Sequence, residues 1–332
     1  MGSYNFETAP NRIGQHTYKW KEAEKDSQVL PAWIADMDFE VLPEIKQTVY
    51  DYADQLVYGY TYASEELINA VLAWERDEHG YTFDKEALVF IEGVVPAIST
   101  AIQAFTKEGD AVLINTPVYP PFARSVKLNN RLLITNSLIE QDDLFQIDFE
   151  QLERDIVDNE VKIYVLCNPH NPGGRVWEED VLEKIGRLCQ KYGVLVVSDE
   201  IHQDLTLFGH KHQSFNTVSL DFKDFSLILA SATKTFNIAG TKNSYAVIEN
   251  PSLRQKFQKR QLANNQHEIS GLGFLATEAA YRYGKAWLTE LKAVLEENID
   301  FVVDYFAKEA PRLRVMKPQG TYLVWLDFSD YG

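Results

Sequence analysis

The 332-residue chain is 45% hydrophobic and 24% charged, which is ordinary for a globular protein, and its length predicts about two domains. Lysine and arginine number 32 against 49 aspartate and glutamate, so the net charge is −17. Binding to nucleic acid or to an anionic membrane needs clustered basic residues, and this balance argues against both. A small anionic ligand stays possible, because one lysine or one helix N-terminus can hold a phosphate in an acidic protein.

The cysteine usage and the N-terminus predict a cytoplasmic protein. Cys167 and Cys189 have no metal-ligand spacing, which is typical of a reducing compartment. The first 22 residues contain no apolar core of a signal peptide. No apolar run approaches the roughly 20 residues that span a bilayer, so we expect no membrane segment.

Short, β-branched and almost wholly apolar segments recur along the first 250 residues. They predict strands at 87–91, 111–115, 131–135, 162–166, 194–198, 226–229 and 244–248. Helical patterns lie between several of them, at 97–105 and at 178–192, where Gly193 ends the pattern. This alternation predicts an α/β domain with a mostly parallel sheet covered by helices, whose ligands bind at the carboxyl ends of the strands.

A second region begins near residue 251. It predicts helices at 252–265, 272–280 and 287–306, and then a turn that leads into a strand at 322–327. A single strand cannot satisfy its own backbone groups. We therefore expect it to pair with the N-terminal segment, or to belong to a small α+β domain that is incomplete at Gly332.

A lysine follows the predicted strand 226–229, in the segment Ser231-Ala-Thr-Lys234. Poor solvation among small residues favours the neutral amine, the form that a Schiff-base lysine needs. Taken alone, the segment also fits a lysine in a loop that points into water.

An acidic residue, Asp199, follows the apolar strand 194–198. Such a carboxylate can cap a helix, bind a metal or keep a ring nitrogen protonated, and the helix cap is the commonest of these.

The segment Cys167-Asn-Pro-His-Asn171-Pro-Gly-Gly174 predicts a defined turn after the strand 162–166. The turn would hold the Asn171 amide at the sheet edge, where it can donate to an anionic oxygen. A tight turn without a ligand is the alternative.

Two further segments lie at strand ends. In Glu92-Gly93-Val94-Val95, the free N–H groups of Val94 and Val95 at a helix start could hold a phosphate. Tyr119 follows the strand 111–115 and could stack on a planar ligand or lie in the core. A phosphate site, a Schiff-base lysine and a carboxylate for a ring nitrogen together predict pyridoxal 5'-phosphate as the cofactor.

The loop His210-Lys-His212 is a weaker candidate for a zinc site, because two histidines in a polar loop are usually solvated. We therefore expect no metal.

Taken together, these motifs resemble the fold-type I pyridoxal-phosphate enzymes of the class I/II aminotransferase superfamily. Among these, the chain is most similar to the MalY/PatB group of cystathionine β-lyases (cysteine-S-conjugate β-lyases). The resemblance covers essentially the whole chain and rests on PAWIADMDF (31–39), VYGYTY (57–62), NTPVYPPF (115–122), CNPHNPGGRVW (167–177), VSDEIHQDL (197–205) and SATKTFNIAG (231–240).

The resemblance implies roles around the cofactor ring. Lys234 would form the Schiff base, Asp199 would pair with the pyridine N1–H, and Asn171 would hydrogen-bond the phenolate oxygen. His202 would lie close by, where many relatives have a tyrosine, and Tyr119 would stack on the ring.

The resemblance also implies a phosphate site and a shared substrate site. Phosphate contacts would come from Val94, Val95, Ser231, Thr233 and Lys242.

The substrate carboxylate would lie beside the backbone of Ile34 and Ala35. Tyr60 would reach the active site of the neighbouring subunit in a homodimer.

The implied reaction is cleavage of cystathionine or a related cysteine thioether to a thiol, pyruvate and ammonia. The motifs alone do not separate this β-lyase from an aminotransferase. Family members continue past 322–327 and carry there an arginine for the substrate carboxylate. Neither Arg312 nor Arg314 matches it, so a catalytically impaired, cofactor-binding regulatory protein is a further alternative.

The expected organisation has three parts. Residues 1–50 contribute to the small domain and the edge of the active site, and 51–250 form the large cofactor-binding domain. Residues 251–332 supply connecting helices and the incomplete small domain.

Overall fold

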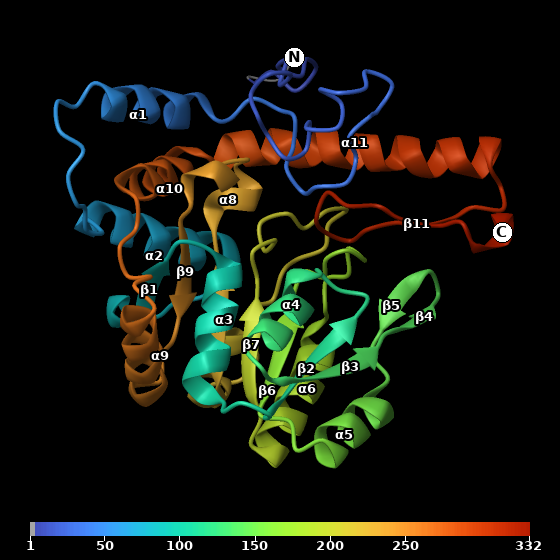
Figure 1. The fold of residues 1–332 in the computed structure, drawn as a ribbon. Coiled ribbons are helices and arrows are strands. Elements are labelled where there is room, and N and C mark those ends of the chain that lie inside the picture. The colour runs from blue at the N-terminus through green and yellow to red at the C-terminus, as the bar shows by residue number, and fades with distance from the viewer. Residues whose placement is uncertain (1–3) are drawn as a thin grey trace.

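The computed structural model describes residues 4–332. A central sheet is enclosed by helices, and the long helix α11 (Lys285–Glu309) crosses above one end of it (Figure 1). The N-terminal segment lies on α11, where the N–H of Tyr4 donates to Glu290 at 3.1 Å.

Seven strands form the main sheet in the order β1-β9-β8-β7-β6-β2-β3. Their bounds are β1 (Leu88–Ile91), β2 (Ala111–Thr116), β3 (Leu132–Ser137), β6 (Ile163–Cys167), β7 (Leu195–Asp199), β8 (Ser226–Ala230) and β9 (Ser244–Val247). From β3 to β8 all neighbours are parallel, whereas β9 is antiparallel to both β8 and β1. The predicted, mostly parallel sheet is confirmed. Because β1 is thereby parallel to β8, its carboxyl end lies at the same edge.

The sheet is apolar on both faces because each face has its own core. In β6, Ile163 and Val165 enter one hydrophobic cluster, whereas Tyr164 and Leu166 enter the other. Successive side chains of a strand point to opposite faces, so a strand covered on both sides reads as a continuous apolar run.

Helices cover both faces and pack against one another above the sheet (Figure 1). Besides α11 they are α1 (Pro43–Ala53), α2 (Glu65–His79), α3 (Val94–Phe105), α4 (Pro121–Leu128), α5 (Phe149–Asp158), α6 (Glu179–Tyr192), α7 (Phe215–Val218), α8 (Ala232–Thr235), α9 (Pro251–Ala263) and α10 (Gly271–Tyr283). As predicted, α6 ends before Gly193, which is left-handed with a φ of 68°. The predicted boundary near residue 50 lies inside α1.

The C-terminal strand differs from the prediction in length and in partner. The strand β11 (Trp325–Asp327) is shorter than 322–327 and pairs antiparallel with β10 (Arg314–Met316), not with the N-terminal segment. The strand begins later than predicted because the backbone of residues 318–322 bonds to loops of the main sheet instead. One example is the 2.8 Å bond from the N–H of Thr321 to the Leu205 carbonyl. A second small hairpin joins β4 (Ile139–Gln141) and β5 (Leu144–Gln146).

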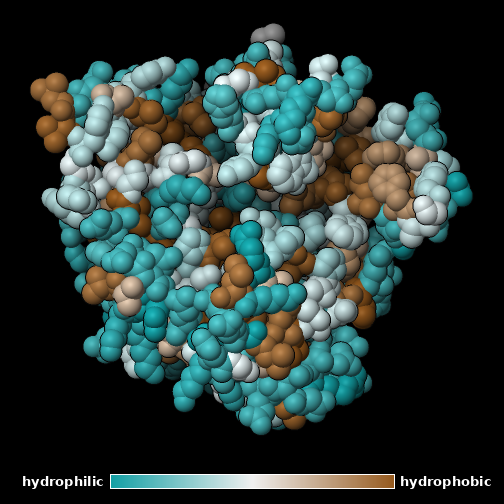
Figure 2. All heavy atoms as spheres, in the orientation of Figure 1, coloured by the Kyte–Doolittle hydropathy of each residue, from teal (hydrophilic) through white to brown (hydrophobic). Residues whose placement is uncertain are grey.

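The connection between α1 and α2 is extended and unusually apolar for a surface. Leu56 is 100% exposed and Tyr60 is 94% exposed, and Val57, Tyr58 and Tyr62 are also exposed. Hydrophobic atoms protrude at this edge of the molecule, at the left of the view (Figure 2). Within residues 4–332, no helix is both long and apolar enough to cross a membrane.

Candidate functional site

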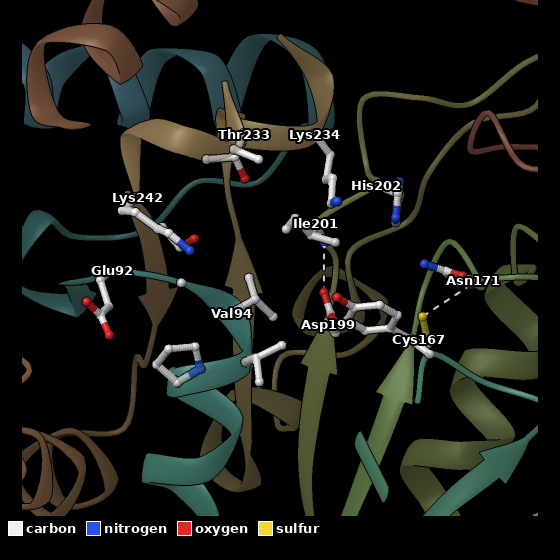
Figure 3. A pocket seen from close by; sticks show the side chains of 16 residues that line it. Glu92, Val94, Cys167, Asn171, Asp199, Ile201, His202, Thr233, Lys234 and Lys242 are labelled. Atoms are coloured by element: carbon white, nitrogen blue, oxygen red, sulfur yellow. Dashed lines mark hydrogen bonds between the residues drawn. The ribbon is translucent and has the colours of Figure 1, made fainter. Parts of the chain in front are cut away.

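A cavity of about 170 Å³ lies at the carboxyl ends of β1, β6, β7 and β8. Figure 3 shows Lys242, Glu92 and Val94 toward one end of it and Lys234, Asp199, His202 and Asn171 toward the other. The complete lining is Glu92, Gly93, Val94, Val95, Pro96, Tyr119, Cys167, Asn171, Asp199, Ile201, His202, Thr233, Lys234, Ala239, Lys242 and Ser244.

Lys234 enters the cavity from α8, the short helix after β8. The hydroxyl of Ser231 caps this helix by accepting from the N–H of Thr233 at 3.1 Å. The Lys234 Nζ donates to the Ala35 carbonyl at 2.6 Å. Burial lowers the pKa of the lysine, although Asp36 and Asp199 oppose that change. The loop-lysine alternative therefore does not hold, because the amine points into the cavity and is partly desolvated.

Asp199 is the last residue of β7 and is buried. Burial raises the pKa of its carboxyl to about 7, against the hydrogen bond from the Ile201 N–H and the positive charge of Lys234. That N–H donates to Asp199 Oδ1 at 3.1 Å (Figure 3). Without a cationic partner, burial disfavours the charged form of this carboxyl. A cation that enters the cavity would stabilise the charged form, so the two would pair strongly.

His202 and Asn171 stand beside Asp199. The His202 Nδ1 is buried without a hydrogen-bond partner among the described residues. Burial, reinforced by Lys234, lowers the pKa of His202 to about 3, so its imidazole is neutral at physiological pH. The Asn171 backbone is fixed, because its N–H contacts the Cys167 Sγ at 3.3 Å and its carbonyl accepts from Tyr119 at 3.1 Å. Burial also raises the pKa of Tyr119.

The opposite end of the cavity suits an anion. Gly93 starts α3 without a side-chain cap and without an acidic residue in the first turn, so the Val94 and Val95 N–H groups have no intrahelical acceptor. Lys242 lies opposite them with a left-handed backbone, φ 56°. These donors and this cation are the usual elements of a phosphate site.

Most of the predicted site residues meet at the cavity, but three groups lie elsewhere. Ser231 does not line it, and its hydroxyl is occupied by Thr233 and by the Asn243 carbonyl at 2.7 Å. Tyr60 is exposed on the α1–α2 connection. Ile34 and Ala35 do not line the cavity, but the Ala35 carbonyl contacts the Lys234 Nζ.

The expectation of a solvated histidine pair is wrong for one member. His210 is exposed, but the His212 side chain is buried, with its Nε2 2.8 Å from the Glu200 carboxylate. A buried carboxylate needs such a partner. Across residues 4–332, no cluster of three or more His, Cys, Asp or Glu side chains could hold a metal ion.

Two contributors have no signal in the sequence. The Tyr322 hydroxyl donates to Ala35 at 3.0 Å, and the Asn237 side chain bonds the backbone of Met37 and Phe39 at 2.9 to 3.0 Å. Both join positions about 200 or more residues apart, which no local pattern can indicate.

Comparison with known proteins places the chain in a family. The profile of the family described as aminotransferase class I and II matches residues 33–331. Cystathionine beta-lyase PatB of Bacillus subtilis (strain 168) is 41% identical over 331 residues, covering 99% of this chain and 86% of that protein. Protein MalY of Escherichia coli (strain K12) is 32% identical over 329 residues, covering 98% of this chain and 84% of that protein.

Solved structures agree. Cystalysin from Treponema denticola, which contains a pyridoxal 5'-phosphate cofactor, is 35% identical with a TM-score of 0.95, covering 99% of this chain and 84% of that one. The PLP-bound C-S lyase from Staphylococcus hominis is 30% identical with a TM-score of 0.93, covering 99% and 83%. The resemblance drawn from the motifs is thereby confirmed, and the chain belongs to the aminotransferase class I and II family.

Proposed function

We propose that this protein is a pyridoxal-phosphate-dependent carbon–sulfur β-lyase that cleaves cystathionine or a related cysteine thioether to a thiol, pyruvate and ammonia. The observation that carries the proposal is one cavity that holds the desolvated Lys234 amine beside the buried Asp199 carboxyl, with an anion site at the far end. The relatives named cystathionine beta-lyase and C-S lyase supply the reaction class.

The cavity fits the cofactor in its chemistry. A phosphate suits the α3 N-terminus with Lys242, a pyridinium nitrogen suits Asp199, and an oxygen on the ring suits Asn171. The buried Nδ1 of His202, which has no hydrogen-bond partner within residues 4–332, is a further polar group that could bond the cofactor. When bound, the cofactor supplies an aldehyde that joins Lys234 and an electron-withdrawing ring that absorbs the carbanion electrons.

Each protein group then has a defined task. The Lys234 nitrogen, whose pKa is lowered by burial, accepts the proton from the substrate Cα. Asp199 keeps a proton on the ring nitrogen, because a buried carboxylate gains from a cationic partner. Tyr119 covers the ring, and the Ile34 and Ala35 backbone borders the substrate carboxylate. Loss of the Cα proton lets the thiolate leave Cβ, and the proton that Lys234 accepted can pass to that sulfur. The remaining three-carbon enamine is then hydrolysed by water to pyruvate and ammonia.

Reductive trapping tests the cofactor assignment. Borohydride treatment of the cofactor-loaded protein followed by peptide mass mapping places the label on Lys234, and Lys234→Ala abolishes it. Lys292→Ala is the matched control, because it removes another lysine whose pKa is lowered by burial but which does not line this cavity. A label on another residue, or none, contradicts the proposal.

Product analysis tests the reaction. Cystathionine yields pyruvate and a thiol without any added acceptor. If a keto acid forms only when an amino-group acceptor is added, the protein is an aminotransferase. If the label forms but no thioether amino acid reacts, it is a cofactor-binding protein without this activity.

We also infer a homodimer in which Tyr60 serves the neighbouring active site. The exposed apolar connection between α1 and α2 supports it, because contiguous apolar surface commonly marks an interface. Mixing Lys234→Ala with Tyr60→Ala chains tests it by complementation. Random reassociation makes half of the dimers hybrid, each with one intact site, so about a quarter of the wild-type activity returns. No recovery, or a fully active monomer by light scattering, refutes the shared site.

We also infer a cytoplasmic location and a division of the chain into a large cofactor domain and a smaller part. Cys167 and Cys189 are free and buried thiols, which supports a reducing, cytoplasmic location. The binding residues between 51 and 250 support a large cofactor domain, with 1–50 and 251–332 completing the edge of the site.

A further inference from the structure

The segment 318–322 is fixed to the loops that build the cavity. The N–H groups of Gln319 and Gly320 both donate to the Gly174 carbonyl, at 2.9 and 3.0 Å. The Gln319 Oε1 accepts from the Arg175 guanidinium at 2.6 Å and from the Val176 N–H at 3.0 Å. This C-terminal segment is therefore fixed to the loop after β6, which carries Asn171.

The backbone is bent sharply within this segment. Thr321 is fully buried and has a φ of 67°, a left-handed conformation that a β-branched residue rarely adopts. Its N–H donates to Leu205 at 2.8 Å, and its hydroxyl accepts from the Leu323 N–H at 3.1 Å. Strained residues of this kind persist where the surrounding contacts fix them, and they cluster at functional sites. Here the bend aims the next side chain, Tyr322, at the cavity rim.

Tyr322 contacts two groups of the site. Its hydroxyl donates to the Ala35 carbonyl at 3.0 Å, and its ring meets His202 edge-on with the centroids 5.9 Å apart. The Ala35 carbonyl also accepts from the Lys234 Nζ at 2.6 Å. Burial and the nearby Asp36 raise the pKa of Tyr322, so the hydroxyl keeps its proton and acts as a donor.

These two donors are not equivalent in the cofactor-loaded enzyme before substrate binds. Cofactor attachment commits the Lys234 nitrogen, and Tyr322 is then the remaining side-chain donor to Ala35 within residues 4–332. The neighbouring residues have other partners: Arg12 and Lys19 bond Asp36, and the Asn237 side chain bonds Met37 and Phe39. Tyr322 is therefore the side chain that bonds the Ala35 carbonyl itself in the loaded enzyme.

We infer that Tyr322 is a substrate-positioning residue, which fixes the Ala35 backbone at the rim where the carboxylate of the amino-acid substrate binds. This inference rests on the proposed function. It assigns to a C-terminal residue a part in substrate binding through a backbone group, without contact between Tyr322 and the reacting atoms.

The test compares Tyr322→Phe with Tyr81→Phe. Both remove one tyrosine hydroxyl that forms a hydrogen bond, but Tyr81 donates to Glu249 at 3.0 Å and Tyr322 to Ala35. The ligand is an α-methyl amino acid, which lacks the Cα proton and cannot react, titrated spectroscopically into the loaded enzyme. One neutral hydrogen bond corresponds to about a two- to tenfold change in affinity.

Tyr322→Phe is expected to raise the dissociation constant of this analogue by that factor and to speed amide hydrogen exchange over residues 34–39 in the loaded enzyme. Tyr81→Phe leaves both unchanged. An unaltered dissociation constant with unaltered exchange in Tyr322→Phe overturns the inference, as does an equal change in both variants. If the wild type takes up no cofactor or no analogue, the proposed function fails instead, so the two failures are distinguishable.

Discussion

The carboxyl of Asp199 carries a stability cost in the ligand-free protein, and Asp199→Asn should remove it. Burial raises the carboxyl pKa from 3.8 to about 7, so the folded protein binds this proton more tightly than the unfolded chain does. A carboxyl with a raised pKa makes stability fall as pH rises between those two values. The amide of asparagine is neutral throughout and escapes this loss.

The size of the effect follows from the two pKa values. The pKa is displaced by about three pH units, and each unit corresponds to about 1.4 kcal/mol. The folding stability lost above pH 8 is therefore at most about 4 kcal/mol. The buried amide also needs hydrogen-bond partners, so we expect a gain of about 2 to 4 kcal/mol. For a chain of 332 residues this corresponds to a rise in Tm of about 3 to 6 °C.

Thermal unfolding of the ligand-free wild type and Asp199→Asn between pH 5 and pH 9 measures this difference in stability. The difference between the two proteins should be smallest at pH 5 and should grow as pH rises to about 7, with Asp199→Asn the more stable. Asp158→Asn, which changes an exposed carboxyl at the end of α5, is the control. Added cofactor should stabilise the wild type more than Asp199→Asn, and turnover of the variant should fall by orders of magnitude. Parallel pH curves for Asp199→Asn and wild type would refute the reasoning.

Two further predictions concern buried contacts around the site. Burial lowers the pKa of His79, but Asp204, 2.6 Å away, together with Glu75 and Glu200 raises it to about 8. The charged pair therefore stabilises the fold fully below about pH 6.5, and this stabilisation is lost as pH rises through 8. In urea titrations, His79→Gln should be about 2 kcal/mol less stable than the wild type at pH 6 and nearly as stable at pH 9. A difference in stability that does not change with pH contradicts this. Gly174→Ala places a Cβ 2.3 Å from Pro318, whereas Gly80→Ala has a similar positive φ and nothing within 4 Å. In the same assay both variants should lose about 1 kcal/mol of folding stability because of the backbone conformation. Gly174→Ala should lose about 2 kcal/mol more because its Cβ is crowded. Equal losses would show that the 318–322 segment is not tightly packed.

The sequence alone determined the fold class and the chemistry at the strand ends. Strands such as β6 read as continuous apolar runs because both faces are covered, and that pattern is local. Lys234, Asp199 and Asn171 were predictable because parallel strands bring their carboxyl ends to one edge, whatever the details of packing. Residue type and topology were sufficient there.

The tertiary structure decided the contacts between distant segments. Lys234 meets Ala35 across 199 residues and Tyr322 meets the same carbonyl across 287, and neither leaves a periodic signal. The partner of β11, the burial of His212 and the bend at Thr321 have the same origin. Each is fixed by hydrogen bonds, because a buried backbone group or carboxylate must have a partner. Which partner is close enough depends on how the layers pack and not on the neighbouring residues along the chain.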